Sequence, residues 1–251
     1  MQLTHVELAG VRIAYRDTGG DDPSPVLLVH GMGGDGHTWD HFAKQLQRHG
    51  RRVIIVDLRG HGRSAHTPTY RFEEFGDDIV RLIDDLGLES VDLVGHSLGG
   101  YAISVAAQER PNVVRRLVIE ECPLPRRSDD PPATLTHRFP TLPELWHAAT
   151  SVLMHPRAVL AFDRKMTKPA LAQFREANDE WWARLADITA PTLVLVGGPG
   201  GMVDPVKLDA LVESVADIRV ERFTTGHSIH RDRFHDFERA VLPFIADSGR
   251  R

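Results

Sequence analysis

The chain has 251 residues, of which 41% are apolar and 26% are charged. This composition is that of an ordinary globular protein and excludes a disordered, collagen-like or disulfide-scaffold chain. The formal net charge is −5 and the arginine pairs are scattered along the chain, so there is no electrostatic footprint for nucleic acid. Cys122 is the single cysteine, which excludes an intrachain disulfide, and no apolar run approaches the ~18 residues of a membrane span. The first residues lack the pattern of a secretion signal, so we expect a soluble, cytoplasmic protein with no membrane or nucleic-acid partner.

Short, continuous apolar runs predict five strands that are buried on both faces. A hairpin around Gly10 precedes them, and the runs themselves cover residues 26–29, 53–56, 91–94, 117–119 and 192–196. Between these strands, apolar residues recur at spacings of three and four, as at Trp39, Phe42 and Leu46, which is typical of amphipathic helices. Strict alternation of strand and helix favours an α/β fold with a mostly parallel sheet and helices on both faces.

The alternation stops between the fourth and fifth of these strands. Residues 123–186 begin with a proline-rich, charged stretch and then carry only helical patterns, including one helix from residue 169 to residue 185. The two ends of such an insertion must meet at neighbouring strand ends. We therefore interpret residues 123–186 as a helical lid inserted into a core domain formed by residues 1–122 and 187–251.

The strongest chemical signal is the pentapeptide from Gly95 to Gly99, which reads G-H-S-L-G around Ser97. It follows a predicted strand and precedes a predicted helix, the context in which G-x-S-x-G forms a nucleophile elbow. A tight turn there holds the serine at the tip of the sheet, and the flanking glycines leave room for neighbouring backbone. The following helix points its free N–H groups and its positive end toward developing negative charge. The pattern therefore predicts Ser97 as a nucleophile.

A second glycine-rich stretch supports this interpretation. The strand at residues 26–29 ends in His30-Gly31-Met32-Gly33-Gly34. Glycines directly after a strand let a backbone N–H approach a substrate oxygen, as an oxyanion hole requires. This second stretch alone is a weak signal, because glycine-rich loops often only turn the chain, but together with the elbow it becomes specific.

With these motifs the chain resembles the α/β-hydrolase superfamily, in its lidded, cofactor-free branch. The resemblance covers nearly the whole chain, including Asp57-Leu58-Arg59-Gly60-His61-Gly62-Arg63-Ser64 and a Gly226-His227 pair near the C-terminus. It implies an eight-stranded sheet, Ser97 as nucleophile, His227 as general base, and the N–H groups of Met32 and Leu98 as the oxyanion hole. It also implies that Asp57 and Arg59 are structural and that no cofactor is needed.

The acidic member of the triad departs from the family pattern. The usual position, a few residues after the strand at 192–196, holds Gly200 instead of an aspartate. Three carboxylates could replace it: Glu121, which matches the acid of some lidded relatives, Asp204 in the same loop, and Glu120. We expect Glu121, because two consecutive acids at the end of a buried strand are costly to desolvate without a role. Asp204 is equally consistent with the N-cap of a following helix.

The remaining histidines and the cysteine have simpler interpretations. His230 competes with His227 but lacks the preceding glycine, so we expect an ordinary residue in the first turn of a helix. His37 and His41 have helical i, i+4 spacing without the glutamate of a zinc motif, so we predict no metal site. We expect His61 to be a surface or loop residue and Cys122 to be a small buried apolar residue.

These residues predict a serine hydrolase that cleaves an ester, a lactone or a thioester of a small to medium, partly apolar substrate through an acyl-serine intermediate. Dehalogenase and epoxide hydrolase relatives use an aspartate nucleophile, and this elbow has Ser97. A C–C bond hydrolase or a cofactor-free perhydrolase would share the same residues. A catalytically silent ligand-binding module on the same fold stays a further alternative. The expected partner is a small molecule, and the chain could be a monomer or a homodimer.

Overall fold

The computed structural model describes residues 1–130, 146 and 156–246. Within these ranges eight strands form one sheet in the order β1-β2-β4-β3-β5-β6-β7-β8. Among them β2 alone runs against its neighbours, and the other pairings from β4 to β8 are parallel. The strands are β1 (Gln2–Leu8), β2 (Val11–Asp17), β3 (Val26–Val29), β4 (Val53–Asp57), β5 (Val91–His96), β6 (Val114–Glu120), β7 (Thr192–Val196) and β8 (Ile218–Arg222). The expected mostly parallel sheet of about eight strands is confirmed.

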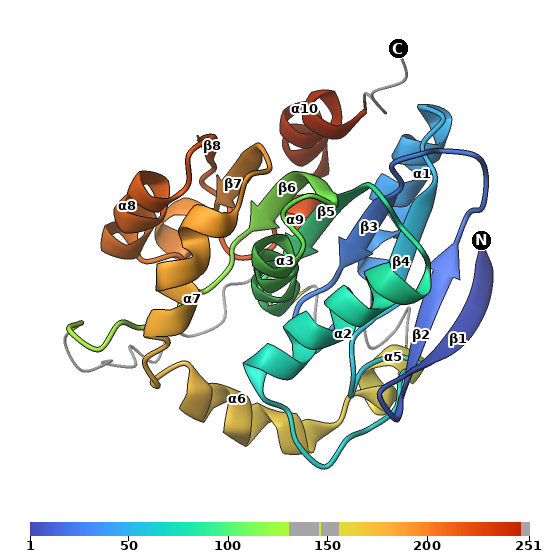
Figure 1. The fold of residues 1–251 in the computed structure, drawn as a ribbon, viewed down its shortest axis with the longest axis horizontal. Helices are drawn as coiled ribbons and strands as arrows, with labels where there is room; N and C mark the ends of the chain where they lie inside the picture. Colours follow the sequence, from blue (N-terminus) through green and yellow to red (C-terminus); the bar gives the residue numbers. More distant parts are fainter. Residues whose placement is uncertain (131–145, 147–155, 247–251) are drawn as a thin grey trace.

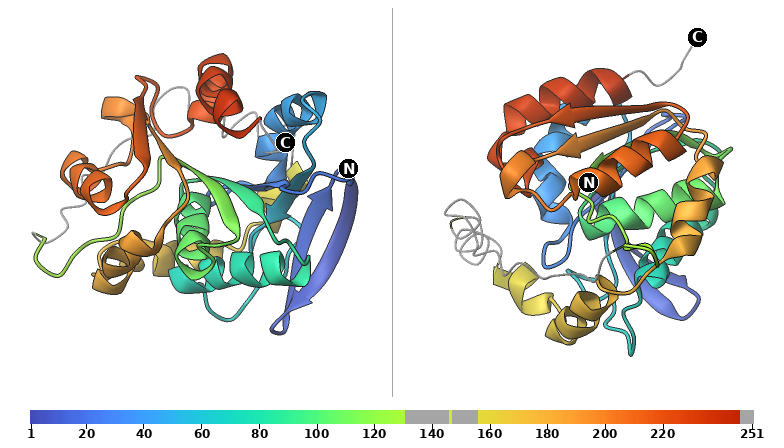
Figure 2. Two further views of the ribbon diagram at one scale, coloured as in Figure 1. Left: turned by 45° about the horizontal axis from the view of Figure 1, so that its top comes forward. Right: turned by 90° about the vertical axis from the view of Figure 1, so that its left-hand side faces the viewer.

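Helices cover both faces of the sheet (Figures 1 and 2). One face packs against α1 and α10 through a cluster that contains Trp39, Phe42 and Phe237. The other face packs against α2, α3 and α8 through a larger cluster. These helices are α1 (Asp40–Arg48), α2 (Phe72–Asp85), α3 (Leu98–Glu109), α8 (Pro205–Ser214), α9 (Ile229–Asp232) and α10 (Phe234–Ile245), with 3₁₀ turns η1 (Gly36–Trp39) and η4 (Gly198–Gly200).

Both faces of the central strands are covered, and β3 is accordingly a continuous apolar run. All four residues of β3 and all six of β5 are buried. Alternate residues of one strand enter opposite clusters, as with Leu27 and Leu28 of β3. Edge strand β8 shows the contrast, since its side chains are half-buried or exposed.

The described part of the segment between β6 and β7 is helical, with some of it packed on the core. It contains α5 (Pro156–Ala161), η2 (Arg164–Met166), α6 (Thr167–Gln173), α7 (Asp179–Ala183) and η3 (Arg184–Asp187). The expectation of a single helix from residue 169 to residue 185 is wrong, because α6 ends at Gln173 and α7 begins at Asp179. Asn178 starts a new helix there by accepting a hydrogen bond from the Trp181 N–H, and Ala177 forms a β-bridge with Arg126. Much of the lid predicted for residues 123–186 lies outside the described residues.

The carboxyl ends of the parallel strands β5, β6 and β7 meet at one edge of the sheet. Ser97 follows β5, Glu121 follows β6, and a glycine-rich loop from residue 197 to residue 202 follows β7. Parallel strands place the chemistry of several loops at this edge, where ligands bind in open α/β sheets. The fold therefore brings together residues that lie 24 and more positions apart in the sequence.

Candidate active site

Ser97 occupies a sharp turn between β5 and α3. Its backbone is strained, with φ 54° and ψ −119°, a region that L-residues rarely adopt. The flanking glycines make the turn possible, because a Cβ at Gly95 would lie 2.5 Å from the Gly99 carbonyl oxygen, and one at Gly99 would lie 2.4 Å from the Val29 carbonyl oxygen. The G-x-S-x-G spacing thus reflects the close contacts of this turn with α3 and β3. In this turn Ser97 is 7% exposed.

His227 reaches Ser97 from the loop after β8. Its Nε2 lies 3.0 Å from the Ser97 Oγ, within hydrogen-bond distance. Gly226, with φ 95°, turns the chain into this position, and its carbonyl oxygen lies where a Cβ on Gly197 would have to go, at 1.9 Å. A side chain at either glycine would push the two loops apart. His227 itself keeps 19% of its side chain exposed, at the open side of the site.

Glu121 lies on the other side of His227. Its Oε2 is 3.4 Å from the His227 Nδ1, longer than a short hydrogen bond but within ion-pair distance, and its side chain is fully buried. Two backbone donors hold the carboxylate, the Gly197 N–H at 2.5 Å from Oε1 and the Met202 N–H at 2.6 Å from Oε2. A Cβ on Gly201 would lie 2.4 Å from Oε1. The loop that lacks the usual aspartate therefore forms a cradle of backbone around an acid from β6.

The two alternative carboxylates do not reach His227. Asp204 caps α8 and accepts hydrogen bonds from the Val206 and Lys207 N–H groups, so the N-cap alternative describes its position. Glu120 is buried and binds His230. Of the three candidates, the structure brings Glu121 alone to the Ser97–His227 pair.

The loop after β3 lies directly against the elbow. A Cβ on Gly31 would approach the Ser97 Cβ to 3.0 Å, so this loop runs past the nucleophile. Leu98 is the first residue of α3, and N–H groups of a first helical turn have no acceptor within the helix. Met32 sits one residue after Gly31, in the same loop. Both segments named for the oxyanion hole therefore border Ser97.

His61 lies in a loop, but it is not a surface residue, because it is fully buried under the loop after β3. Its Nε2 accepts a hydrogen bond from the Gly33 N–H at 3.1 Å, and its Nδ1 faces the Arg59 carbonyl oxygen at 2.9 Å. Burial, with the neighbouring His30 adding to it, lowers the pKa of His61 to about 3. The neutral ring can therefore accept and donate at once. The signal in the sequence that could have indicated this buried contact is the stretch Gly60-His61-Gly62.

Asp57, Arg59 and Cys122 bind or pack against other parts of the protein. Asp57 accepts hydrogen bonds from the N–H groups of Gly36 and Arg63, so it joins two loops. Arg59 forms a bidentate pair with buried Asp78. Cys122 is buried, as expected, and burial raises the pKa of its thiol.

The two histidines with helical spacing bind other side chains of the protein. His37 lies 3.1 Å from the Asp35 carboxylate, and the His41 ring stacks on Phe234 at 3.8 Å between centroids. His230 does lie in the first turn of a helix, α9, but it is buried. Its buried contact with Glu120 was not foreseen.

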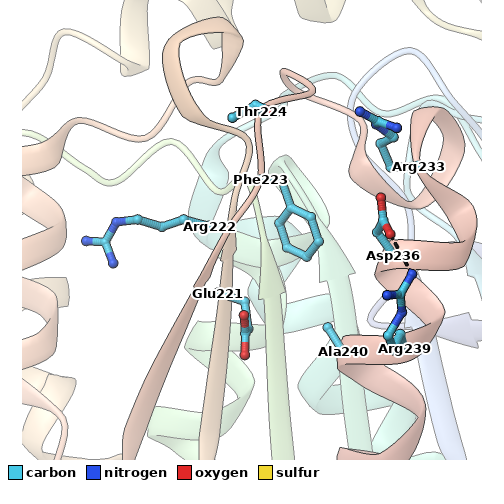
Figure 3. A pocket seen from close by; sticks show the side chains of 8 residues that line it. All are labelled: Glu221, Arg222, Phe223, Thr224, Arg233, Asp236, Arg239 and Ala240. Carbon is cyan, nitrogen blue, oxygen red and sulfur yellow. Dashed lines mark hydrogen bonds and ion pairs between the residues drawn. The ribbon is translucent and has the colours of Figure 1, made fainter.

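A groove of about 450 Å³ lies apart from these residues, between β8 and α10 (Figure 3). Phe223 points toward α10, and Asp236 pairs with Arg239 at 2.8 Å across one turn of the helix. Neither Ser97 nor His227 lines this groove. Its lining residues are Glu221, Arg222, Phe223, Thr224, Arg233, Asp236, Arg239 and Ala240.

The geometry at Ser97 supports nucleophilic chemistry. A hydroxyl, an imidazole and a buried carboxylate are connected by contacts of 3.0 and 3.4 Å, and α3 begins directly after the serine. This is the arrangement that lets a serine lose its proton to a histidine as it attacks a carbonyl carbon. Residues 24–168 match the alpha/beta hydrolase fold family. The chain belongs to this family and is a hydrolase.

Individual relatives agree with this assignment. The chain is 26% identical to the mouse sn-1-specific diacylglycerol lipase ABHD11 over 271 aligned positions, which cover 96% of this chain and 88% of the lipase. A hydrolase from Pseudomonas aeruginosa has a similar structure, with a TM-score of 0.79, 27% identity and 98% of each chain covered. Est816, described as an N-acyl homoserine lactone degrading enzyme, is 25% identical, with a TM-score of 0.72 and coverage of 96% and 100%. In the part of the chain that the structure describes, no helix is long and apolar enough to cross a membrane.

Proposed function

We propose that the protein is a serine hydrolase that cleaves an ester, a lactone or a thioester, with Ser97 as nucleophile, His227 as general base and Glu121 as the acid of the triad. The observation that carries this proposal is the 3.0 Å contact between the Ser97 Oγ and the His227 Nε2. Chemistry of this kind needs the base within hydrogen-bond reach of the proton that it removes.

The reaction begins when the Ser97 Oγ attacks the substrate carbonyl carbon while its proton passes to the His227 Nε2. The carbonyl oxygen becomes an oxyanion, which the N–H groups of Leu98 and Met32 stabilise, each such donor contributing on the order of 3 kcal/mol. The imidazolium then protonates the leaving alcohol, thiol or lactone oxygen as the C–O or C–S bond breaks. Water, deprotonated by the same histidine, attacks the acyl-serine and releases the acid.

Glu121 orients and stabilises the His227 ring in this scheme. A carboxylate at Nδ1 favours the tautomer whose Nε2 accepts the serine proton, and it stabilises the imidazolium that forms. The N–H groups of Gly197 and Met202 fix the carboxylate. The 3.4 Å separation fits a resting enzyme, because catalytic hydrogen bonds are often long before substrate binds.

Two features support a substrate of ester type. Relatives matched over most of their length include one named a diacylglycerol lipase and one described as an N-acyl homoserine lactone degrading enzyme, and both names contain a substrate with an ester bond. The segment predicted as a lid, residues 123–186, follows Glu121 and leaves the sheet at the edge that carries Ser97. We propose that it covers the substrate and selects the acyl or alcohol group.

The experiment that tests the proposal is labelling with a fluorophosphonate, followed by steady-state rates on p-nitrophenyl esters, thioesters and lactones of graded length. We expect stoichiometric labelling at Ser97, with loss of fluoride, and measurable turnover of at least one ester class. Absence of labelling under conditions in which the protein is folded would favour the silent ligand-binding alternative. Labelling without turnover of any ester, lactone or thioester would favour the C–C hydrolase or perhydrolase alternatives.

A further inference from the structure

Two buried side chains next to the proposed triad have no part in the scheme above. His96 directly precedes Ser97, and Glu120 directly precedes Glu121. The two residues are partners in the register of β5 and β6, and the Ser97 N–H donates to the Glu120 carbonyl oxygen at 2.8 Å. Both side chains are buried, at 8% and 0% exposure. Each of them contacts the segment that carries His227.

His96 holds the backbone of the base. Its Nε2 lies 2.7 Å from the His227 carbonyl oxygen, which can only accept, so the ring carries its proton on Nε2 and donates it. The two rings lie 4.6 Å apart between centroids. Burial lowers the pKa of His96 well below its usual value, so the ring is neutral at neutral pH. A neutral donor at this point adds no competing positive charge beside His227.

Glu120 holds the same segment three residues further on. Its Oε1 accepts hydrogen bonds from the His230 backbone N–H and from the His230 Nδ1, both at 2.9 Å. The His230 ring stacks on Trp39 at 4.2 Å between centroids, which keeps it in place. The start of α9 is therefore attached to the end of β6 by a buried carboxylate.

We infer that His96 and Glu120 are positioning residues that hold His227 between the nucleophile and the acid. This inference rests on the proposed function, because positioning has a consequence only if His227 is the base. The chain thus supplies Ser97 to the reaction after β5 and Glu121 after β6. The residues directly before them, His96 and Glu120, hold the segment that carries the base. Such a support matters because a displacement of about 1 Å in a reacting group can cost on the order of 100-fold in rate.

The charge of Glu120 gives the support an electrostatic consequence. Burial raises the pKa of Glu120 to about 7, although neighbouring histidines oppose the shift. In its ionised form the carboxylate stabilises a positive charge on His227. The titratable and charged groups that face this site are His96 from β5, Glu121 after β6, and His227, His230 and Arg231 from the loop and helix after β8.

The first test measures the second-order rate of Ser97 labelling by a fluorophosphonate in variants of His96. We expect His96→Ala to label at least about 30-fold more slowly than the wild type and His96→Gln, which keeps an N–H donor near the same place, within about fivefold. Ser104→Ala is the matched control, since it removes two buried hydrogen bonds of Ser104 in α3, with Tyr101 and Trp181, and neither involves His96, Glu120 or His227. We expect this control to label within about twofold of the wild type.

The second test uses Glu120→Gln, which preserves shape and an acceptor for the His230 N–H but removes the charge. Labelling rate is followed from pH 5 to pH 9. We expect the acidic limb of the profile to move by about 0.5 unit or more, because the amide removes the carboxyl group that ionises near pH 7 next to the base. A merely structural role for Glu120 would leave the limb where it is.

The outcomes separate the two proposals. If the wild type is not labelled at all, the proposed function fails. A second outcome is that the wild type is labelled, that Glu120→Gln leaves the acidic limb unmoved and that His96→Ala labels at the wild-type rate. The proposed function then stands and the positioning roles are overturned. Should His96→Ala not fold, the Glu120→Gln profile and the rate of His96→Gln decide: an unmoved limb, or a loss in His96→Gln as large as about 30-fold, overturns the inference.

Discussion

Ser97 and Glu121 both have positive φ angles, of 54° and 47°, which L-residues rarely adopt. Each directly follows a strand, and the residues before them, His96 and Glu120, are paired in the sheet. The chain thus leaves both β5 and β6 through a residue with a positive φ angle. Strain of this kind costs on the order of 1–3 kcal/mol per residue and persists where the surrounding structure holds it. Here the two turns aim a hydroxyl and a carboxylate at the same imidazole.

The strain at Ser97 predicts opposite effects on activity and stability. We expect Ser97→Ala to abolish ester hydrolysis with little change in melting temperature, because the hydroxyl serves chemistry and not packing. Ser97→Gly should also be inactive but more stable by up to about 1 kcal/mol, since glycine adopts this backbone without strain. Thermal unfolding and initial rates on an activated ester check both variants. Turnover of Ser97→Ala within about tenfold of the wild type would contradict the nucleophile assignment.

The position of Glu121 predicts a ranking of two amide substitutions. We expect Glu121→Gln to lower kcat by at least about 100-fold, because an amide cannot favour the reactive tautomer of His227 or stabilise the imidazolium. Asp204→Asn should cost less than about tenfold in kcat and about 1 kcal/mol or less in stability, since it weakens a helix cap. Rates at saturating ester together with urea unfolding measure the two effects.

The reverse ranking would place the acid in the loop after β7, contrary to the contacts of Glu121. Wild-type rates in both variants would mean that Ser97 and His227 act as a dyad.

The backbone cradle around Glu121 predicts a role for Gly201. A Cβ at this position would lie 2.4 Å from the carboxylate, so Gly201→Ala must displace either Glu121 or the loop. We expect kcat to fall by about tenfold or more, with KM changed less. A double-mutant cycle with Glu121→Gln provides the control, because residues that act through one contact are not additive. If Gly201→Ala costs the same factor in the presence and absence of the Glu121 carboxylate, the cradle has no part in catalysis.

The buried, neutral His61 predicts a pH dependence of stability. Its pKa of about 3 in the folded protein lies below the unfolded value of about 6.5, so between these values the unfolded chain binds a proton that the folded chain does not. The contribution is absent above pH 6.5, and the protein loses up to about 1.4 kcal/mol per pH unit as the pH falls from there toward 3.

The comparison variant for this effect is His61→Gln, which cannot titrate and keeps an acceptor for the Gly33 N–H. Its unfolding free energy between pH 6 and pH 4 should fall less steeply than that of the wild type, by about 1.4 kcal/mol per unit. His5→Gln, an exposed position on β1, is the control and should keep the wild-type slope. Equal slopes for the wild type and His61→Gln would show that His61 is protonated without cost.

Local patterns in the sequence predicted the alternation of strands and helices and the elbow at Ser97, and the resemblance to the family added the eight-stranded sheet and His227. Continuous apolar runs predict strands such as β3 and β5 because burial on both faces demands them. The glycines around Ser97 mark the elbow because a side chain at Gly95 would collide with the backbone of Gly99, and one at Gly99 with the backbone of Val29. Gly226 marks His227 for a related reason. Each of these signals lies within a few residues of the feature that it predicts, so it is visible in the sequence alone.

The tertiary structure decided what depends on distant segments meeting. Nothing near Glu120 or Glu121 in the sequence distinguishes their roles; the difference arises because Glu121 takes a left-handed turn into the loop after β7 while Glu120 stays in the strand and meets His230. The burial of His61 likewise follows from the loop after β3, which lies 28 residues earlier in the chain. Carboxylates and imidazoles are defined by their partners, and in a parallel sheet those partners come from the ends of other strands.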